Sequence, residues 1–209
     1  EMWNAFTKDQ DTLEDFKPPI QYSEDVKSDG FVQPFSDSPL DDESIGENTY
    51  IELLAQAKSY VYIFTPYLII DSEMKSALCM AAKRGVDVRI VTPGIPDKKI
   101  IYRLTRSNYA PLLKNGVKIY EYTPGFIHAK SYVCDDEFAV VGTINMDYRS
   151  LYLHFECGTF MYRTHCIMSL KKDSLETIAK SRQINLCDCR QGFFGRLFDS
   201  VLRVFSPIF

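Results

Sequence analysis

The stretch "FIHAKSYVCDDEFAVVGTINMDYRS", residues 126–150, decides the fold because it places two apolar segments on either side of a short acidic link. The segments 127–134 and 137–141 are rich in β-branched and aromatic residues, which favours strands. Asp135 and Asp136 stand between them, and so short a polar link is typical of a β-hairpin. We therefore expect two paired strands here.

Outward from this hairpin, strands and helices alternate along the chain. Apolar strands are predicted at 31–35, 60–65, 86–91, 117–121 and 155–162, and helices at 48–58, 72–84, 98–114 and 166–182. Asn48 is expected to cap the first helix, and Gly85 to end the second in a left-handed conformation. The alternation implies an α/β fold in which helices cover both faces of a mixed, largely parallel sheet.

Composition predicts a soluble globular chain with a sizeable core. The sequence has 209 residues, of which 45% are hydrophobic and 13% aromatic. Its longest apolar run, 60–70, is about half the length that a membrane-spanning helix needs, roughly 20 residues. The six cysteines form no CxxC pair, which favours a reducing, cytoplasmic-side setting over a metal or disulfide framework.

Charge is unevenly distributed along the chain. Residues 1–47 hold 13 acidic and 3 basic residues, whereas 48–209 hold 15 acidic and 21 basic residues. A basic body favours an anionic or phosphate-bearing partner, although so small an excess is also typical of an ordinary solvated surface. We divide the chain into a linker or arm at 1–29, one α/β domain at 30–185 and an amphipathic tail at 186–209.

Three polar residues stand out in and after the apolar hairpin. Side chains two positions apart on a strand share a face, so His128 and Lys130 are expected to point the same way. Asn145 follows the second strand through Gly142 and Thr143, where small residues let a ligand approach the backbone and the hydroxyl can donate. Together these groups would form a cradle the size of a phosphate.

The spacing HxKx4Dx6GTxN over 128–145 is similar to the HKD signature of the phospholipase D superfamily, since six positions agree over eighteen residues. Further segments look like the second half of bacterial cardiolipin synthases: "TPY" at 65–67, "GVKIYEY" at 116–122 and "GTINMDYRSLYLHFE" at 142–156. The resemblance covers nearly everything from residue 30 onward. It implies a phospholipase D-like α/β/α sandwich.

The resemblance also implies a set of roles. His128 is nucleophile or general acid, with the acid/base role favoured; Lys130 and Asn145 hold phosphate oxygens; and Glu156 is a carboxylate hydrogen-bonded to the histidine. His154 stands where asparagine is usual; it either alters the local titration or fills space, and we favour the second interpretation. No cofactor and no metal ion are implied. The supporting residues are Asp135, which we assign to structure, and Gly142, Thr143, Asp147 and Arg149.

By the same resemblance, the intact enzyme joins two phosphatidylglycerols through a phosphohistidine and releases glycerol, on the cytoplasmic side of the cell membrane. The reaction needs two HKD motifs, and residues 1–100 contain no histidine. We therefore expect a fragment that lacks an N-terminal HKD half, or else a chain that pairs as a homodimer.

Two alternatives stay open, a homodimeric metal-independent nuclease and a non-catalytic membrane-binding domain. The absence of a broad basic stripe argues against nucleic acid as a partner, and the complete motif argues against the binding domain.

The tail carries apolar residues at helical spacing. It is predicted to form an amphipathic helix that either lies in a membrane interface near anionic headgroups or packs onto the domain. The residues on its apolar face are Phe193, Phe194, Leu197, Phe198, Val201, Leu202 and Phe205.

Overall fold

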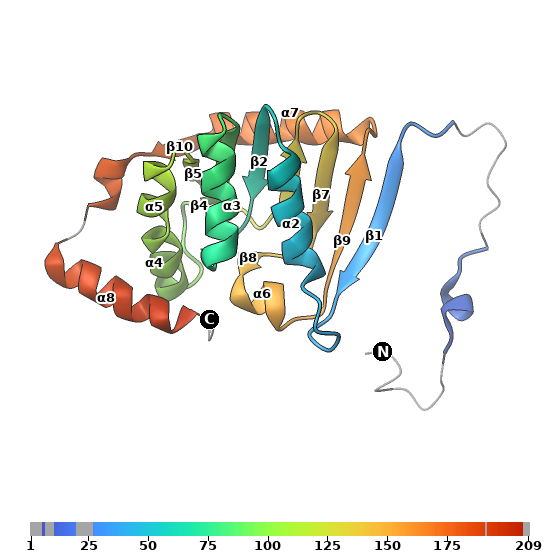
Figure 1. The fold of residues 1–209 in the computed structure, drawn as a ribbon, viewed down its shortest axis with the longest axis horizontal. Coiled ribbons are helices and arrows are strands. Elements are labelled where there is room, and N and C mark those ends of the chain that lie inside the picture. Colours follow the sequence, from blue (N-terminus) through green and yellow to red (C-terminus); the bar gives the residue numbers. More distant parts are fainter. Residues whose placement is uncertain (1–5, 7–10, 20–26, 191, 207–209) are drawn as a thin grey trace.

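The fold is a large sheet between two layers of helices (Figure 1). A computed structural model describes the chain except for residues 1–5, 7–10, 20–26, 191 and 207–209. In the described part, eight strands form one sheet in the order β1-β9-β7-β6-β2-β4-β5-β10. They are β1 (Phe31–Asp37), β2 (Tyr60–Phe64), β4 (Asp87–Pro93), β5 (Lys118–Tyr122), β6 (Ser131–Cys134), β7 (Phe138–Gly142), β9 (Glu156–Tyr162) and β10 (Ser181–Ile184).

Helices connect several of the strands, and a small second sheet forms where the chain leaves β2 and β7. Strands β3 (Leu68–Ile69) and β8 (Met146–Asp147) pair in parallel there. The helices are α2 (Ile45–Gln56), α3 (Ser72–Lys83), α4 (Lys99–Ser107), α5 (Tyr109–Lys114), α6 (Tyr148–Tyr152), α7 (Cys166–Ala179) and α8 (Phe193–Val204), with 3-10 turns η1 (Leu13–Phe16) and η2 (Leu186–Cys189).

The α/β class and the mixed sheet are confirmed, but the expectation of a largely parallel sheet was wrong. Only the pairings of β2 with β4 and of β4 with β5 are parallel in the main sheet of the described chain. The other five pairings are antiparallel. Parallel neighbours need a long crossover connection, whereas β6 and β7 are joined by a tight turn that permits only antiparallel pairing.

Strand β2 shows why the sheet is covered on both faces. Its five residues are all buried, and they alternate between two hydrophobic cores. Val61 and Ile63 pack in the core that also holds residues of α2, α3 and α5. Tyr62 and Phe64 pack in the other core, which includes residues of α7. Figure 1 shows these helices on opposite sides of the sheet, so a continuous apolar strand is the expected pattern.

The β6–β7 hairpin forms where it was predicted. Asp135 and Asp136 both have positive φ, 51° and 62°, which is the backbone of a type I′ turn. The Asp135 carboxylate accepts hydrogen bonds from the backbone N–H groups of Lys58, Ser59 and Tyr60, at 2.6 to 2.9 Å. Asp135 therefore ties the turn to the start of β2, which is a structural role.

Several element boundaries differ from the sequence prediction. Helix α2 begins at Ile45 and not near Asn48, because Asp37 of β1 accepts from the N–H groups of Ile45 and Gly46. The helix predicted at 98–114 is two helices that meet at Asn108, and Pro111 lacks the N–H needed to continue the first. Strand β10 was missed, since its first two residues fall in the end of the helix predicted at 166–182 and the other two follow directly.

The main sheet runs from β1, which begins at Phe31, to β10, which ends at Ile184. The division at 29/30 and 185/186 stays a prediction, and parts of the arm (1–5, 7–10, 20–26) and of the tail (191, 207–209) lie outside the described residues. Among the helices that the structure describes, none has both the length and the apolar character to span a bilayer.

Candidate active site

The β6–β7 hairpin brings the two parts of the motif together. Ser131 pairs with Val141 in the antiparallel ladder, and the backbone N–H of Gly142 donates to the carbonyl oxygen of Lys130 at 3.2 Å. The segment before β6 and the segment after β7 therefore lie at the same end of the hairpin. The predicted strand at 127–134 begins only at Ser131, so His128 lies in the segment without regular secondary structure that leads into it.

His128 is exposed and sits between two aromatic rings. Its imidazole stacks on Phe126 with ring centroids 5.7 Å apart, and Tyr67 approaches it edge-on at 6.5 Å. Partial burial and the nearby Lys130 ammonium lower the pKa of His128, against an opposing effect of Asp97. The neutral ring, which can accept a proton or attack phosphorus, is therefore favoured.

Lys130 is half-buried, and its side chain folds back toward the backbone of the preceding residues. Its Nζ donates to the carbonyl oxygen of His128 at 2.7 Å. Burial lowers the pKa of the Lys130 ammonium, while the carboxylates of Glu156 and Asp147 act to raise it. One of three N–H donors is used by the His128 carbonyl, so the ammonium has donors left for an anionic oxygen.

A cavity of about 590 Å³ lies beside these residues. Tyr67 connects this cavity with His128, since its side chain lines the cavity and its ring also meets the His128 imidazole edge-on. The Oδ1 atom of Asn145 is buried without a hydrogen-bond partner among the described residues. His128 and Lys130 are outside the lining, which consists of Tyr67, Ile69, Lys98, Lys99, Ile100, Ile101, Asn145, Asp147, Arg149 and His154.

Glu156 is held firmly, but by other partners than the resemblance implies. Thr143 donates its hydroxyl to Oε2, Ser150 donates its hydroxyl to Oε1 at 2.5 Å, and His154 Nδ1 lies 3.5 Å from Oε1. In the part of the chain that the structure describes, no hydrogen bond joins Glu156 to His128. Among the described residues, the imidazole within ion-pair distance of this carboxylate is that of His154.

The two small residues of the motif, Gly142 and Thr143, contact residues of the neighbouring strand β9. A Cβ on Gly142 would overlap the backbone of Cys157, so the close approach here is to β9 and not to a ligand. The Thr143 hydroxyl, expected to be a ligand donor, is engaged with Glu156. Ser150 also donates to Glu156, and it was not predicted as a site residue. Its place five residues after the asparagine of the motif, in α6, was the feature of the sequence that could have indicated it.

Asp147 and Arg149 line the cavity without pairing with each other among the described residues. Asp147 is buried and caps α6 by accepting from the Ser150 N–H at 2.9 Å. Burial raises the pKa of the Asp147 carboxyl. Within the described residues, no group of three or more His, Cys, Asp or Glu side chains is arranged to hold a metal ion.

The fold and this site define a phospholipase D-like domain. The solved structure of a phospholipase D family member, Nuc from Salmonella typhimurium, is similar with a TM-score of 0.62 at 16% identity, over 74% of this chain and 98% of that chain. Phosphatidylserine synthase from Haemophilus influenzae is similar with a TM-score of 0.65 at 16% identity, over 85% of this chain and 45% of that chain. At these identities the likeness concerns the fold.

The chain belongs to the family described as cardiolipin synthase, PLD-like domain, whose model matches residues 50–176. An uncharacterized protein from Streptococcus mutans is 50% identical over all of this chain and 45% of its own length. The cardiolipin synthases of Alkalihalophilus pseudofirmus and Geobacillus kaustophilus are 39% and 36% identical, over 88% and 99% of this chain. The chain spans less than half of each of these relatives, 37% and 41% for the two synthases.

Proposed function

We propose that this chain is a catalytic half of a cardiolipin synthase-type phosphatidyltransferase, which acts on phosphatidylglycerol at an anionic membrane surface. The hydrogen bond from Gly142 N–H to the Lys130 carbonyl carries the proposal, because it fixes the His-x-Lys segment beside the segment that bears Asn145. The cardiolipin synthases among its relatives support the choice of reaction.

The reaction consists of two displacements at phosphorus. A histidine nitrogen attacks the phosphorus of the first phosphatidylglycerol, the P–O bond to glycerol breaks, and a second histidine gives a proton to the glycerol oxygen. A hydroxyl of the second phosphatidylglycerol then loses its proton to that second histidine and attacks phosphorus, which breaks the P–N bond. Each step conserves atoms and charge without a redox partner.

His128 supplies one of the two imidazoles, and an N-terminal HKD half or a second copy of the chain supplies the other. The lowered pKa of His128 supports a role that starts from the neutral ring. In the acid/base assignment, the neutral ring is the form left after the proton has passed to glycerol, and this form then takes the proton from the acceptor alcohol. Lys130 and Asn145 hold non-bridging phosphate oxygens, and Glu156 organises the surrounding side chains.

The test is turnover with phosphatidylglycerol vesicles and, separately, with plasmid DNA, both in the presence of a chelator. The chain is assayed alone and fused to the first half of the 50% identical relative. We expect the fusion to form cardiolipin and glycerol, the isolated monomer to be inactive or feeble, and His128→Ala to abolish product in the fusion.

His165→Ala is the matched control, since His165 is largely exposed and contacts Asp29 away from the motif. DNA cleavage without lipid product would replace the proposal with a homodimeric nuclease. Vesicle binding without turnover by the fusion would replace it with a binding domain.

A further inference from the structure

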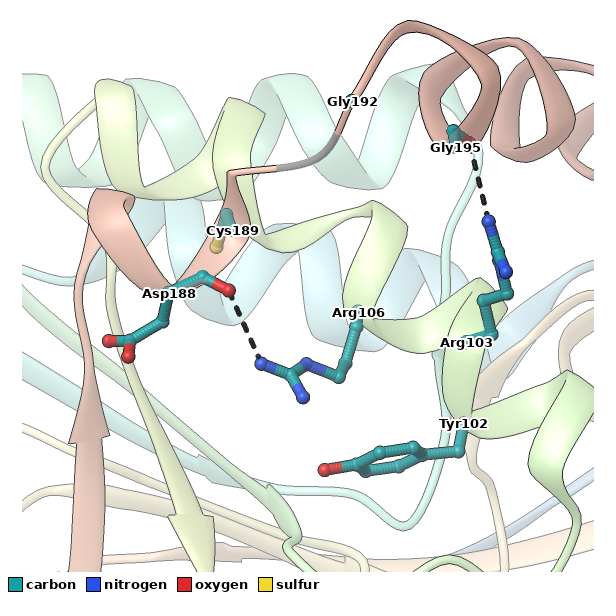
Figure 2. Close-up of a pocket in the computed structure, with 7 residues that line it drawn as sticks. All are labelled: Tyr102, Arg103, Arg106, Asp188, Cys189, Gly192 and Gly195. Carbon is teal, nitrogen blue, oxygen red and sulfur yellow. Dashed lines mark hydrogen bonds between the residues drawn. The ribbon is translucent and has the colours of Figure 1, made fainter.

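Helix α8 contacts the domain through a narrow polar strip. Asp199 is only 3% exposed and accepts from Arg103 Nε of α4 at 2.7 Å. Arg103 also donates from Nη2 to the carbonyl oxygen of Gly195 at 3.3 Å, as Figure 2 shows. Ser206, just past the helix, is buried as well. These positions share one side of the helix, which also carries partly buried Leu202, so the side that faces the body is mostly polar or small.

Most apolar residues of α8 are exposed instead, although the centroid of the Phe198 ring also lies 4.5 Å from the guanidinium carbon of Arg103. Such exposure reverses the arrangement of an amphipathic helix that packs on a core. The expectation that this face packs onto the domain is therefore not met by the described residues. The side chains that are about half exposed or more are Phe193, Phe194, Leu197, Phe198, Val201, Val204 and Phe205.

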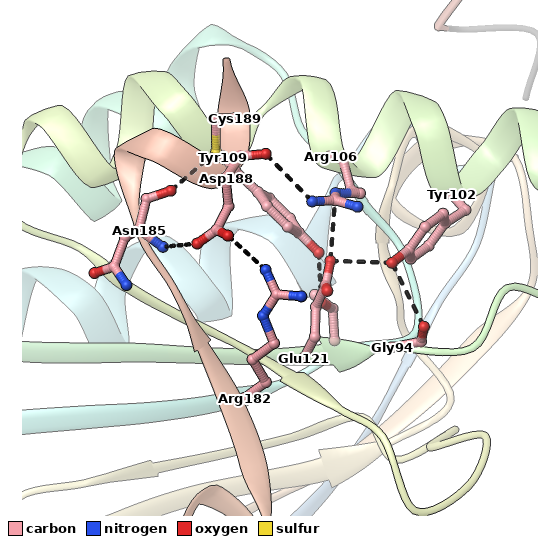
Figure 3. A network of polar contacts seen from close by, with 10 residues as sticks. Gly94, Tyr102, Arg106, Tyr109, Glu121, Arg182, Asn185, Asp188 and Cys189 are labelled. Atoms are coloured by element: carbon pink, nitrogen blue, oxygen red, sulfur yellow. Dashed lines mark hydrogen bonds and ion pairs between the residues drawn. The ribbon is translucent and has the colours of Figure 1, made fainter. Parts of the chain in front are cut away.

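The hollow between α8 and α4 is poorly suited to bind an anionic ligand. This cavity of about 500 Å³ is lined by Arg103 and Arg106 (Figure 2). Arg103 is paired with Asp199, and Arg106 Nε lies 3.4 Å from Oε1 of buried Glu121, within the network of Figure 3. Both guanidinium groups are already neutralised, so the cavity offers no excess charge to an anion.

Unpaired positive charge lies at a second hollow, which Asp199 and Arg106 also line. A smaller hollow of about 240 Å³ is lined by residues of α5 and α8, including Lys114 and Arg203. Both side chains belong to exposed residues, and neither has a carboxylate within ion-pair distance in the described part of the chain. The one acid lining this hollow, Asp199, is occupied by Arg103. Two exposed cations, Lys114 and Arg203, without a carboxylate partner among the described residues therefore lie beside and on α8.

We infer that α8 is an interfacial membrane helix, which the Arg103–Asp199 ion pair holds with its apolar face turned toward a bilayer that carries anionic headgroups. Phenylalanine and aliphatic side chains enter the boundary of the acyl chains, while Lys114 and Arg203 meet the headgroup phosphates. This deepens the proposed function, because it names the surface through which the chain reaches its lipid. Figure 1 shows α8 at the lower left, beside α4.

Vesicle flotation tests the inference without any need for turnover. The chain carrying His128→Ala is mixed with vesicles of phosphatidylcholine alone or with phosphatidylglycerol added. The helix variant is Leu197→Gln with Val201→Gln, two positions that are 53% and 51% exposed. The charge variant is Lys114→Gln with Arg203→Gln. We expect each to reduce binding to the anionic vesicles by roughly tenfold or more, and the unsubstituted helix to prefer anionic over neutral vesicles.

Met168→Gln with Leu175→Gln on α7 is the matched control. These apolar side chains are 50% and 37% exposed, and α7 covers the opposite face of the main sheet from α4. Circular dichroism and thermal unfolding verify that every variant folds.

The inference is overturned by unchanged binding in the helix variant, by equal loss in the α7 control, or by indifference to lipid charge. It is also overturned if the helix variant converts a dimer to a monomer by light scattering and leaves flotation unchanged, because α8 would then be a contact between two copies. Loss of flotation with intact turnover on soluble substrate analogues would separate this inference from the proposed chemistry.

Discussion

Ser150 donates its hydroxyl to Oε1 of Glu156 at 2.5 Å, while Thr143 donates to the other carboxylate oxygen. The carboxylate is thus fixed from both sides, and only about a tenth of the Glu156 side chain is exposed. A carboxylate held in this way keeps one orientation toward its neighbours. One is His154, whose Nδ1 lies 3.5 Å from Oε1, and another is the Lys130 ammonium, whose pKa the carboxylate acts to raise. The position of Glu156 is therefore set by two hydroxyl groups.

Ser150→Ala and Thr143→Val should each lower the turnover of the enzyme with both HKD halves by up to about 100-fold, with a smaller effect on KM. The reason is that a displaced Glu156 carboxylate no longer holds the neighbouring side chains in their reactive positions. Steady-state kinetics at several lipid concentrations measure this split. Ser174→Ala serves as the control, since that hydroxyl donates to Leu170 within α7, far along the chain from the motif. Wild-type kcat in Ser150→Ala would contradict the positioning role.

The pKa of His128 should lie below the ordinary value of 6.5, and Lys130→Met should raise it. The physical reason is that the Lys130 ammonium disfavours a second positive charge, and burial acts in the same direction. Folding therefore favours the neutral ring, and the associated stability is lost as pH falls below about 6.5 through the lowered pKa. NMR titration of the three histidines in the wild type and in Lys130→Met measures the shift.

Lys98→Met is the comparison for that titration, because Lys98 is exposed and its charge is not among the causes of the His128 shift. An unchanged His128 pKa in Lys130→Met would show that the ammonium lies too far from the ring to act on it.

Asp135→Asn should destabilise the domain by about 2 kcal/mol, since the carboxylate accepts from three backbone N–H groups and the amide offers only one acceptor oxygen. Asparagine tolerates the positive φ of this position, so the change tests the hydrogen bonds and not the turn. Urea unfolding measures the free energy. The same substitution at exposed Asp173 of α7 should leave the midpoint almost unchanged, and equal effects at both positions would remove the structural assignment.

Glu47→Gln should stabilise the domain at pH 7 by about 1 kcal/mol. Glu47 is buried, and its Oε1 has no partner among the described residues, while Tyr152 donates to Oε2 at 2.6 Å. Burial raises the pKa of Glu47, Tyr152 opposes this, and Asp71 adds to it. The ionised form thus costs stability at neutral pH, and the neutral amide removes that cost.

The advantage of Glu47→Gln should shrink as pH falls through the raised pKa toward the usual 4.5, because Glu47 itself then becomes protonated. Urea midpoints between pH 7 and pH 4 follow the change, with Glu176→Gln on the exposed side of α7 as the control. A variant that is less stable than wild type at pH 7 would show that the carboxylate is net favourable.

The hairpin and the layer order were predictable because they depend on local chemistry and on periodicity. Two aspartates that tolerate positive φ between apolar strands specify a tight turn, and the buried run of β2 specifies cover on both faces. The motif spacing likewise pointed to His128, Lys130 and Asn145, and their catalytic roles stay predictions.

The sequence by itself determined most of the strands and helices though not β10, which residues form the motif, and that the tail is amphipathic. Only the tertiary structure decided the strand directions at the sheet edges, the cap that Asp37 provides for α2, and the partners of Glu156. It also decided that Asp199 turns inward and the phenylalanines of α8 outward. The physical reason is that periodicity and turn chemistry act between near neighbours, whereas these contacts join groups whose distance is fixed only when the layers pack.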